Sequence, residues 1–127
     1  MSKDAVPRGS QQTHVTLNVL IVEDNGETYG GLRRATSASP NGYRMCDAST
    51  ECGALYQLGI SLPDIVILDV TTRAQEGLAT LEHVREVSSV PVIALSDEED
   101  PQARIQCLER GADCCVPRDV TPGELLA

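Results

Sequence analysis

Short aliphatic runs recur along the chain, and each stops at polar residues. The runs cover residues 17–22, 65–68 and 90–95, with few polar interruptions. Runs that are too short for a helix and apolar on successive residues predict strands covered on both faces. Two weaker segments, residues 43–47 and 113–116, predict an edge strand and a last short strand. The pattern therefore predicts five strands.

Segments with helical periodicity separate these strands. Residues 72–87 carry leucine and valine at steps of three, which is typical of a helix with one buried side. Helices are also predicted over residues 50–58, behind a Ser-Thr cap, and over residues 101–110, which begin with proline and are followed by glycine. Residues 27–38 give the weakest predicted helix, because two adjacent glycines each cost about 1 kcal/mol relative to alanine.

The strict alternation of strand and helix defines the expected fold class. It predicts an α/β domain with a flavodoxin-like, doubly wound, five-stranded parallel sheet and helices on both faces. The residues from Thr121 onward read as the first turn of a fifth helix that is cut short. We expect the domain to span residues 17–127, and residues 1–16 to be a disordered tail or a cloning remnant.

The charge balance excludes one class of partner. Ten basic residues stand against nineteen acidic ones, for a net charge of −9, and Lys3 is the one lysine in the chain. Nucleic-acid binding needs clustered basic side chains, so this segment is not expected to contact nucleic acid directly. No apolar stretch approaches the ~20 residues that span a bilayer, and no hydrophobic signal segment is present. A cytoplasmic location without membrane contact is therefore expected.

The cysteines and histidines offer no metal or disulfide pattern. The five cysteines contain no Cys-x-x-Cys pair and lie far from both histidines, so a zinc site or a disulfide framework is not expected. Small, buried apolar side chains are the plainer interpretation of the cysteines. His14 and His83 are expected at the surface, without partners.

Polar groups follow four of the predicted strands. Glu23 and Asp24 come directly after the first strand and Asp69 after the central one, while Ser96 and Arg118 follow the last two. In open parallel sheets such groups gather at the carboxyl edge, near the point where strand order reverses. Three converging carboxylates repel one another unless a hard cation such as Mg²⁺ lies among them. With the hydroxyl and the guanidinium nearby, the cluster predicts a site for a phosphoryl group.

Each of these residues also has a plainer interpretation. Asp69 could cap a helix, and Glu23 and Asp24 could cap the helix that follows them. Ser96, which precedes an acidic run, could equally begin a helix. The convergence of three acids at one sheet edge favours metal binding over capping.

Four segments carry a family resemblance. They are Val19–Asn25, Pro63–Asp69, Pro91–Ser96 and Gly111–Asp113. In this order and spacing they resemble the receiver domain of two-component response regulators. The resemblance runs from about Leu17 to the end of the sequence.

The resemblance implies a role for each candidate residue. Asp69 would accept a phosphoryl group from a sensor histidine kinase. Glu23, Asp24 and Asp69 would hold Mg²⁺ together with the backbone carbonyl of Thr71. Ser96 would donate a hydrogen bond to the phosphoryl group and act as the switch hydroxyl. By the same resemblance the domain is a phospho-acceptor rather than an enzyme, apart from a slow loss of its own phosphoryl group.

The chain departs from the family pattern around this site. Arg118 stands where the family has the lysine of a Lys-Pro pair, unless the loop is one residue shorter, which would leave no cation there. Cys115 occupies the position of the aromatic residue that moves with the switch hydroxyl. Arg73 lies in the pair that replaces the usual Met-Pro after the acceptor. These departures mark an atypical receiver.

Three functions therefore compete. The first is phosphorylation at Asp69 that switches an output, which could be a DNA-binding domain beyond the C-terminus. The second is a degenerate receiver that acts without phosphorylation, through a small ligand or through protein contacts such as a homodimer. The third is a nucleotide-binding enzyme, which is disfavoured because no glycine-rich phosphate loop follows the first strand.

Overall fold

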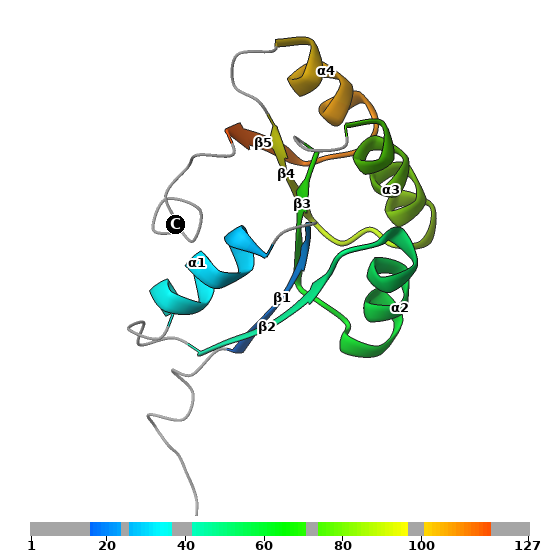
Figure 1. Cartoon of the computed structure of the whole chain (residues 1–127). Helices are drawn as coiled ribbons and strands as arrows, with labels where there is room; N and C mark the ends of the chain where they lie inside the picture. The colour runs from blue at the N-terminus through cyan, green and yellow to red at the C-terminus, as the bar shows by residue number, and fades with distance from the viewer. Residues whose placement is uncertain (1–15, 24–25, 37–41, 71–73, 97–100, 118–127) are drawn as a thin grey trace, which may run out of the picture.

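Five parallel strands form one sheet in the computed structural model, which describes residues 16–23, 26–36, 42–70, 74–96 and 101–117 (Figure 1). The strands are β1 (Thr16–Val22), β2 (Gly42–Ala48), β3 (Ile65–Asp69), β4 (Val92–Ser96) and β5 (Cys114–Pro117). Their order across the sheet is β2-β1-β3-β4-β5, and every neighbouring pair is parallel. The order reverses between β1 and β3, so the predicted doubly wound sheet is confirmed.

Helices cover both faces of the sheet, as predicted. They are α1 (Glu27–Thr36), α2 (Glu51–Ser61), α3 (Ala74–Val87) and α4 (Pro101–Glu109). In Figure 1, α1 lies on one face and α2, α3 and α4 lie on the other. Helix α1 forms despite its adjacent glycines because Leu32 is fully buried against the sheet. The fifth helix expected from Thr121 lies outside the described residues. Strand β1 begins at Thr16, one residue earlier than predicted.

The core is aliphatic and has two parts, one on each face. Successive residues of each strand point to opposite faces. Leu20 and Leu68 therefore pack with the helices α2, α3 and α4, whereas Ile21 and Ile67 pack with α1. This matches the core that a chain without Phe or Trp can build. Within the described part, α3 is the longest helix at 14 residues, and no helix has the length and apolar character needed to cross a membrane.

An ion pair and three hydrogen bonds join α3 to the far end of the sheet. Arg85 donates from Nε to the carbonyl of Gly111 at 2.7 Å and from a terminal nitrogen to Asp113 Oδ2 at 2.6 Å. The same carboxylate oxygen accepts from the backbone N–H of Val92 at 2.8 Å. Gly111 has a φ of +116°, and a Cβ there would collide with the Arg85 side chain. This joint fixes where β4 and β5 begin, and so where their carboxyl ends lie.

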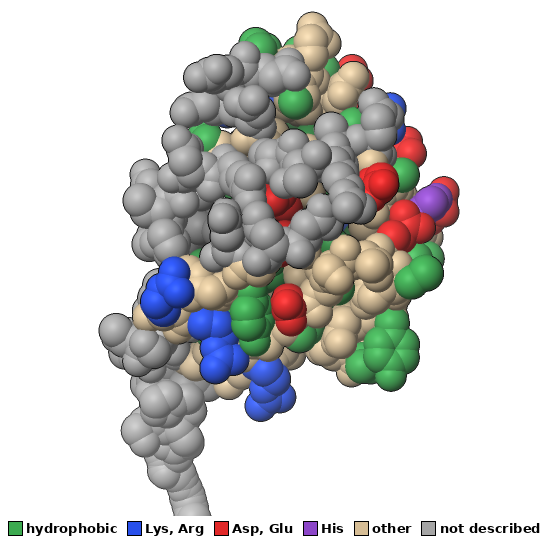
Figure 2. All heavy atoms as spheres, in the orientation of Figure 1, with side chains coloured by type: hydrophobic (Ala, Val, Ile, Leu, Met, Phe, Trp, Pro, Cys, Tyr) green, Lys and Arg blue, Asp and Glu red, His purple; other side chains and the backbone are tan. Residues whose placement is uncertain are grey.

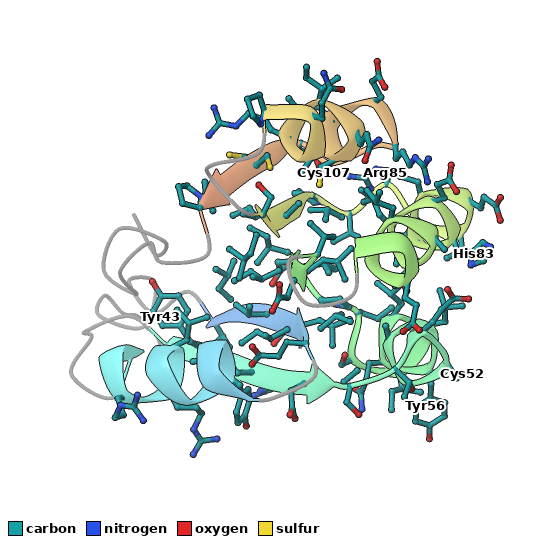
Figure 3. The ribbon with its side chains drawn as sticks, turned by 45° about the horizontal axis from the view of Figure 1, so that its top comes forward. Tyr43, Cys52, Tyr56, His83, Arg85 and Cys107 are labelled. Atoms are coloured by element: carbon teal, nitrogen blue, oxygen red, sulfur yellow. The ribbon has the colours of Figure 1, made fainter. Side chains whose placement is uncertain are left out.

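Two expectations about single residues are corrected. Only Cys107 among the five cysteines is buried, while Cys52 and Cys114 are exposed. Cys52 lies on the outer side of α2, and Cys114 lies on the edge strand β5, where one side faces solvent (Figure 3). His83 was expected without a partner, but its Nδ1 lies 2.7 Å from Glu51 Oε2. In the space-filling view the histidine, drawn purple, lies against acidic side chains (Figure 2).

The packing predicts which leucine matters most for stability. Leu81 of α3 is 0% exposed, whereas Ile105 of α4 is 45% exposed. The substitution Leu81→Ala should lower the free energy of unfolding by about 2–5 kcal/mol, because it leaves a cavity in the core. The control Ile105→Ala should change it by roughly 0.5 kcal/mol or less. Urea denaturation measures both, and equal losses would contradict the assigned core.

Candidate functional site

Two of the predicted carboxylates lie side by side at the carboxyl edge of the sheet. Glu23 directly follows β1, and Asp69 is the last residue of β3. Val22 pairs with Leu68 in the register of these strands, so one step further along the chain Glu23 lies beside Asp69. The pairing of Val19 with Ile65 and of Ile21 with Ile67 puts both acids on the same face of their strands.

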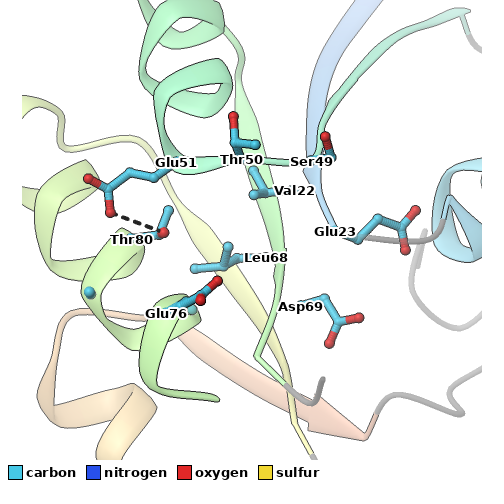
Figure 4. A pocket seen from close by; sticks show the side chains of 11 residues that line it. Val22, Glu23, Ser49, Thr50, Glu51, Leu68, Asp69, Glu76 and Thr80 are labelled. Carbon is cyan, nitrogen blue, oxygen red and sulfur yellow. Dashed lines mark hydrogen bonds between the residues drawn. The ribbon is translucent and has the colours of Figure 1, made fainter. Parts of the chain in front are cut away.

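Both carboxylates line a cavity of about 270 Å³. Its other walls come from the first turn of α2 and from α3, and they contribute three further polar side chains, Glu51, Glu76 and Thr80. Figure 4 shows the Glu23 and Asp69 carboxylates on one side of this space and the Glu51 and Thr80 side chains across from them. The cavity therefore opens at the point where strand order reverses, which is where ligands bind in sheets of this type.

Glu23 is nearly buried, with 6% of its surface exposed. Its Oε2 accepts a hydrogen bond from the backbone N–H of Tyr29 at 2.8 Å, in the first turns of α1. The capping interpretation is thus correct for this residue. It does not compete with metal binding, because a carboxylate offers about four lone pairs on two oxygens and the cap uses one. The partial positive charge of the helix N-terminus also stabilises the buried negative charge.

The residues present fit a hard divalent cation. Glu23 and Asp69 offer carboxylate oxygens at one cavity, and Mg²⁺ is held in many proteins by one or two carboxylates while water and phosphate fill its other positions. Within the described ranges, no group of three or more His, Cys, Asp or Glu side chains could hold a metal ion. The other two predicted ligands, Asp24 and Thr71, lie outside those ranges. The described part of the site therefore supplies two oxygen ligands.

Ser96 ends β4, on the strand next to Asp69. Asp69 pairs with Leu95 in the register of β3 and β4, and Ser96 is the following residue. Only 2% of its surface is exposed. Its Oγ lies 2.9 Å from the Sγ of Cys115, on β5. The cysteine that replaces the expected aromatic residue is thus in direct contact with the predicted switch hydroxyl. The predicted cation, Arg118, and the neighbouring Arg73 lie outside the described residues.

Sequence reasoning missed a polar group on the far wall of the cavity. Glu51 begins α2, behind Thr50, whose side chain accepts from the N–H of Gly53 at 3.0 Å. The Glu51 carboxylate contacts two side chains of α3, His83 at 2.7 Å and Thr80 at 3.3 Å. His83 and Thr80 are three residues apart and so share a helix face, which is the one signal the sequence offered. Their meeting with Glu51 depends on how two helices pack.

With this geometry in hand, comparison with known proteins defines the family. A model of the response regulator receiver domain matches residues 19–127. The KDP operon transcriptional regulatory protein KdpE of Escherichia coli (strain K12) is 34% identical over 110 residues, which cover 87% of this chain and 48% of that protein. The response regulator MprA of Mycobacterium ulcerans is 30% identical over 114 residues, covering 89% of this chain and 48% of that protein.

A solved structure supports the fold independently. The receiver domain of the Francisella response regulator 1452 superimposes with a TM-score of 0.73 at 20% identity, covering 87% of this chain and 90% of that one. The chain therefore belongs to the response regulator receiver domain family. It spans about half the length of the two relatives named above.

The hydrogen bond of Glu23 predicts the result of two substitutions. Glu23→Ala removes the acceptor of the Tyr29 N–H and should lower the free energy of unfolding by about 1 kcal/mol. Glu23→Gln keeps an oxygen at the same place and should cost less than half as much. Chemical denaturation of the two variants measures the difference. If both variants lose the same stability, the cap does not hold α1.

Proposed function

We propose that this domain accepts a phosphoryl group on Asp69 from a sensor histidine kinase. The observation that carries the proposal is the cavity at the switch point of the sheet, where Asp69 and the buried Glu23 lie on adjacent strands. Membership of the receiver family supports the assignment of Asp69 as the acceptor.

The chemistry asks little of the protein beyond placement. An Oδ atom of Asp69 attacks the phosphorus of a phosphohistidine in line, the O–P bond forms as the N–P bond breaks, and the departing imidazole keeps the electron pair. The product is an acyl phosphate. Bound Mg²⁺, held by Glu23 and Asp69 with Asp24 and the Thr71 carbonyl, supplies charge neutralisation for the transferred group.

Other residues of the chain complete the proposed site. The position of Ser96, one residue beyond the β-ladder partner of Asp69, suits donation of its O–H to a phosphoryl oxygen. Arg118 would pair with the same group as a permanent cation, with a planar fork in place of an ammonium ion. The added phosphoryl group carries about two negative charges, which would draw the Ser96 hydroxyl inward and change the neighbouring surface.

The biological setting is part of the proposal. The names of the relatives include a transcriptional regulatory protein and a response regulator, and the matched region covers about half of each. We infer a role in controlling transcription through a DNA-binding output domain, in the cytoplasm, with the receiver itself contacting proteins rather than nucleic acid. The net charge of −9 is consistent with this division of labour.

Substitution at two ends of one strand tests the acceptor. With Mg²⁺ and a small phosphodonor such as acetyl phosphate, the unmodified chain should gain the mass of one phosphoryl group. Asp69→Asn should show no gain, because an amide cannot form the acyl phosphate. The matched control is Asp64→Asn, at the opposite end of β3, where the carboxylate accepts from the N–H of Asn18 at 2.8 Å and an amide oxygen can do the same.

Intact-protein mass spectrometry reads all three chains. Phosphoryl uptake by Asp69→Asn equal to that of Asp64→Asn would exclude Asp69 as the acceptor. If even the unmodified chain takes up nothing, and an Asp69→Ala variant keeps normal output in the cell, the domain acts without phosphorylation.

A further inference from the structure

Three polar side chains link the buried side of α4 to the carboxyl edge of the sheet. Cys107 of α4 is 0% exposed and belongs to the larger core, against which the half-buried Cys115 of β5 packs. Cys115 in turn lies with its Sγ 2.9 Å from the Oγ of Ser96 on β4. Figure 3 shows Cys107 on the side of α4 that faces β4 and β5. The three residues therefore form a continuous row of hydrogen-bonding groups.

The chemistry of Cys107 gives this row a direction. The pKa of its thiol is raised to about 12, first by burial and then by Cys115, with which it shares a side-chain hydrogen bond, while the charge of Arg110 acts weakly in the opposite sense. A hydrogen bond raises the pKa of a thiol when that thiol is the donor. Cys107 therefore stays protonated at neutral pH and donates its S–H to the sulfur of Cys115.

The second hydrogen bond follows from the first. With its sulfur already accepting from Cys107, Cys115 directs its own S–H toward Ser96 Oγ. A hydroxyl that accepts one hydrogen bond from inside the protein is left with its O–H to donate elsewhere. Ser96 is the last residue of β4, so its O–H can turn to the edge of the sheet on which Asp69 lies.

We propose that Cys115 is a positioning residue, which accepts from Cys107, donates to Ser96, and so holds the Ser96 hydroxyl ready to donate to an oxyanion bound beside Asp69. The inference rests on the proposed function for the identity of that oxyanion, but not for the hydrogen bonds themselves. It assigns a use to a thiol at a position where a small side chain could otherwise only leave space.

Infrared spectroscopy of the S–H stretch tests the hydrogen bonds without any ligand. Replacing Cys46, Cys52 and Cys114 by serine leaves two thiol bands, from Cys107 and Cys115. Adding Cys115→Ala should leave one band, from Cys107, moved to higher frequency because its acceptor is gone. A Cys107 band that keeps its position would overturn the proposal. Cys107→Ser, which keeps a donor in the core, should leave the Cys115 band unmoved, and its shift would also count against the proposal.

Binding of beryllofluoride, a mimic of the acyl phosphate, tests the consequence at the site. In Mg²⁺, Cys115→Ala should weaken binding by about three- to tenfold, the usual range for one lost hydrogen bond. Cys115→Ser, which can still accept and donate, should restore binding to within about twofold of the unmodified chain. The matched control is Cys114→Ala, because Cys114 is exposed and neighbouring strand residues point to opposite faces.

Fluorine NMR reads the bound mimic. Equal affinity of Cys115→Ala and Cys114→Ala would overturn the positioning role, as would a failure of Cys115→Ser to recover binding. If the unmodified chain binds no beryllofluoride, the proposed function fails instead, while the S–H spectra still decide whether the two thiols are joined as described.

Discussion

The parallel pairing of β1 with β3 is the constraint on which the rest of the structure depends. Their amino ends are joined in both directions, because Asp64 donates its N–H to the carbonyl of Asn18 at 2.7 Å and accepts from the Asn18 N–H through its side chain at 2.8 Å. This clasp fixes the register, and the register then places Glu23 beside Asp69 at the other end. A slip of one residue would turn one acid to the opposite face.

Much of the fold could be predicted because strand and helix patterns are local. The differences arise where hydrogen bonding decides the boundary. Strand β4 begins at Val92 rather than Val90, since Pro91 has no N–H to give to a ladder. Helix α2 continues past the predicted end to Ser61 and stops where Leu62 adopts a left-handed conformation with φ of +47°, which the leucine gives no reason to expect. Helix propensity alone cannot locate such an end.

The candidate site divides in the same way. The acids were predictable because residues that follow parallel strands must share one edge, whatever the details of packing. The contact of Glu51 with His83, and that of Ser96 with Cys115, join elements that are distant in sequence. Each depends on how a helix or an edge strand lies against its neighbour, which the residue pattern does not encode. The cysteine at position 115 was interpreted as a loss, whereas its sulfur makes a specific contact.

The central claim is that Glu23 and Asp69 hold one divalent cation between them. Calorimetric titration with Mg²⁺ tests it most directly when applied to the unmodified chain, Glu23→Gln, Asp69→Asn and the double variant. Two ligands of one ion should be strongly non-additive, so the double variant should bind little worse than the weaker single variant. Independent losses that add in free energy, or affinity unchanged in either single variant, would contradict the account.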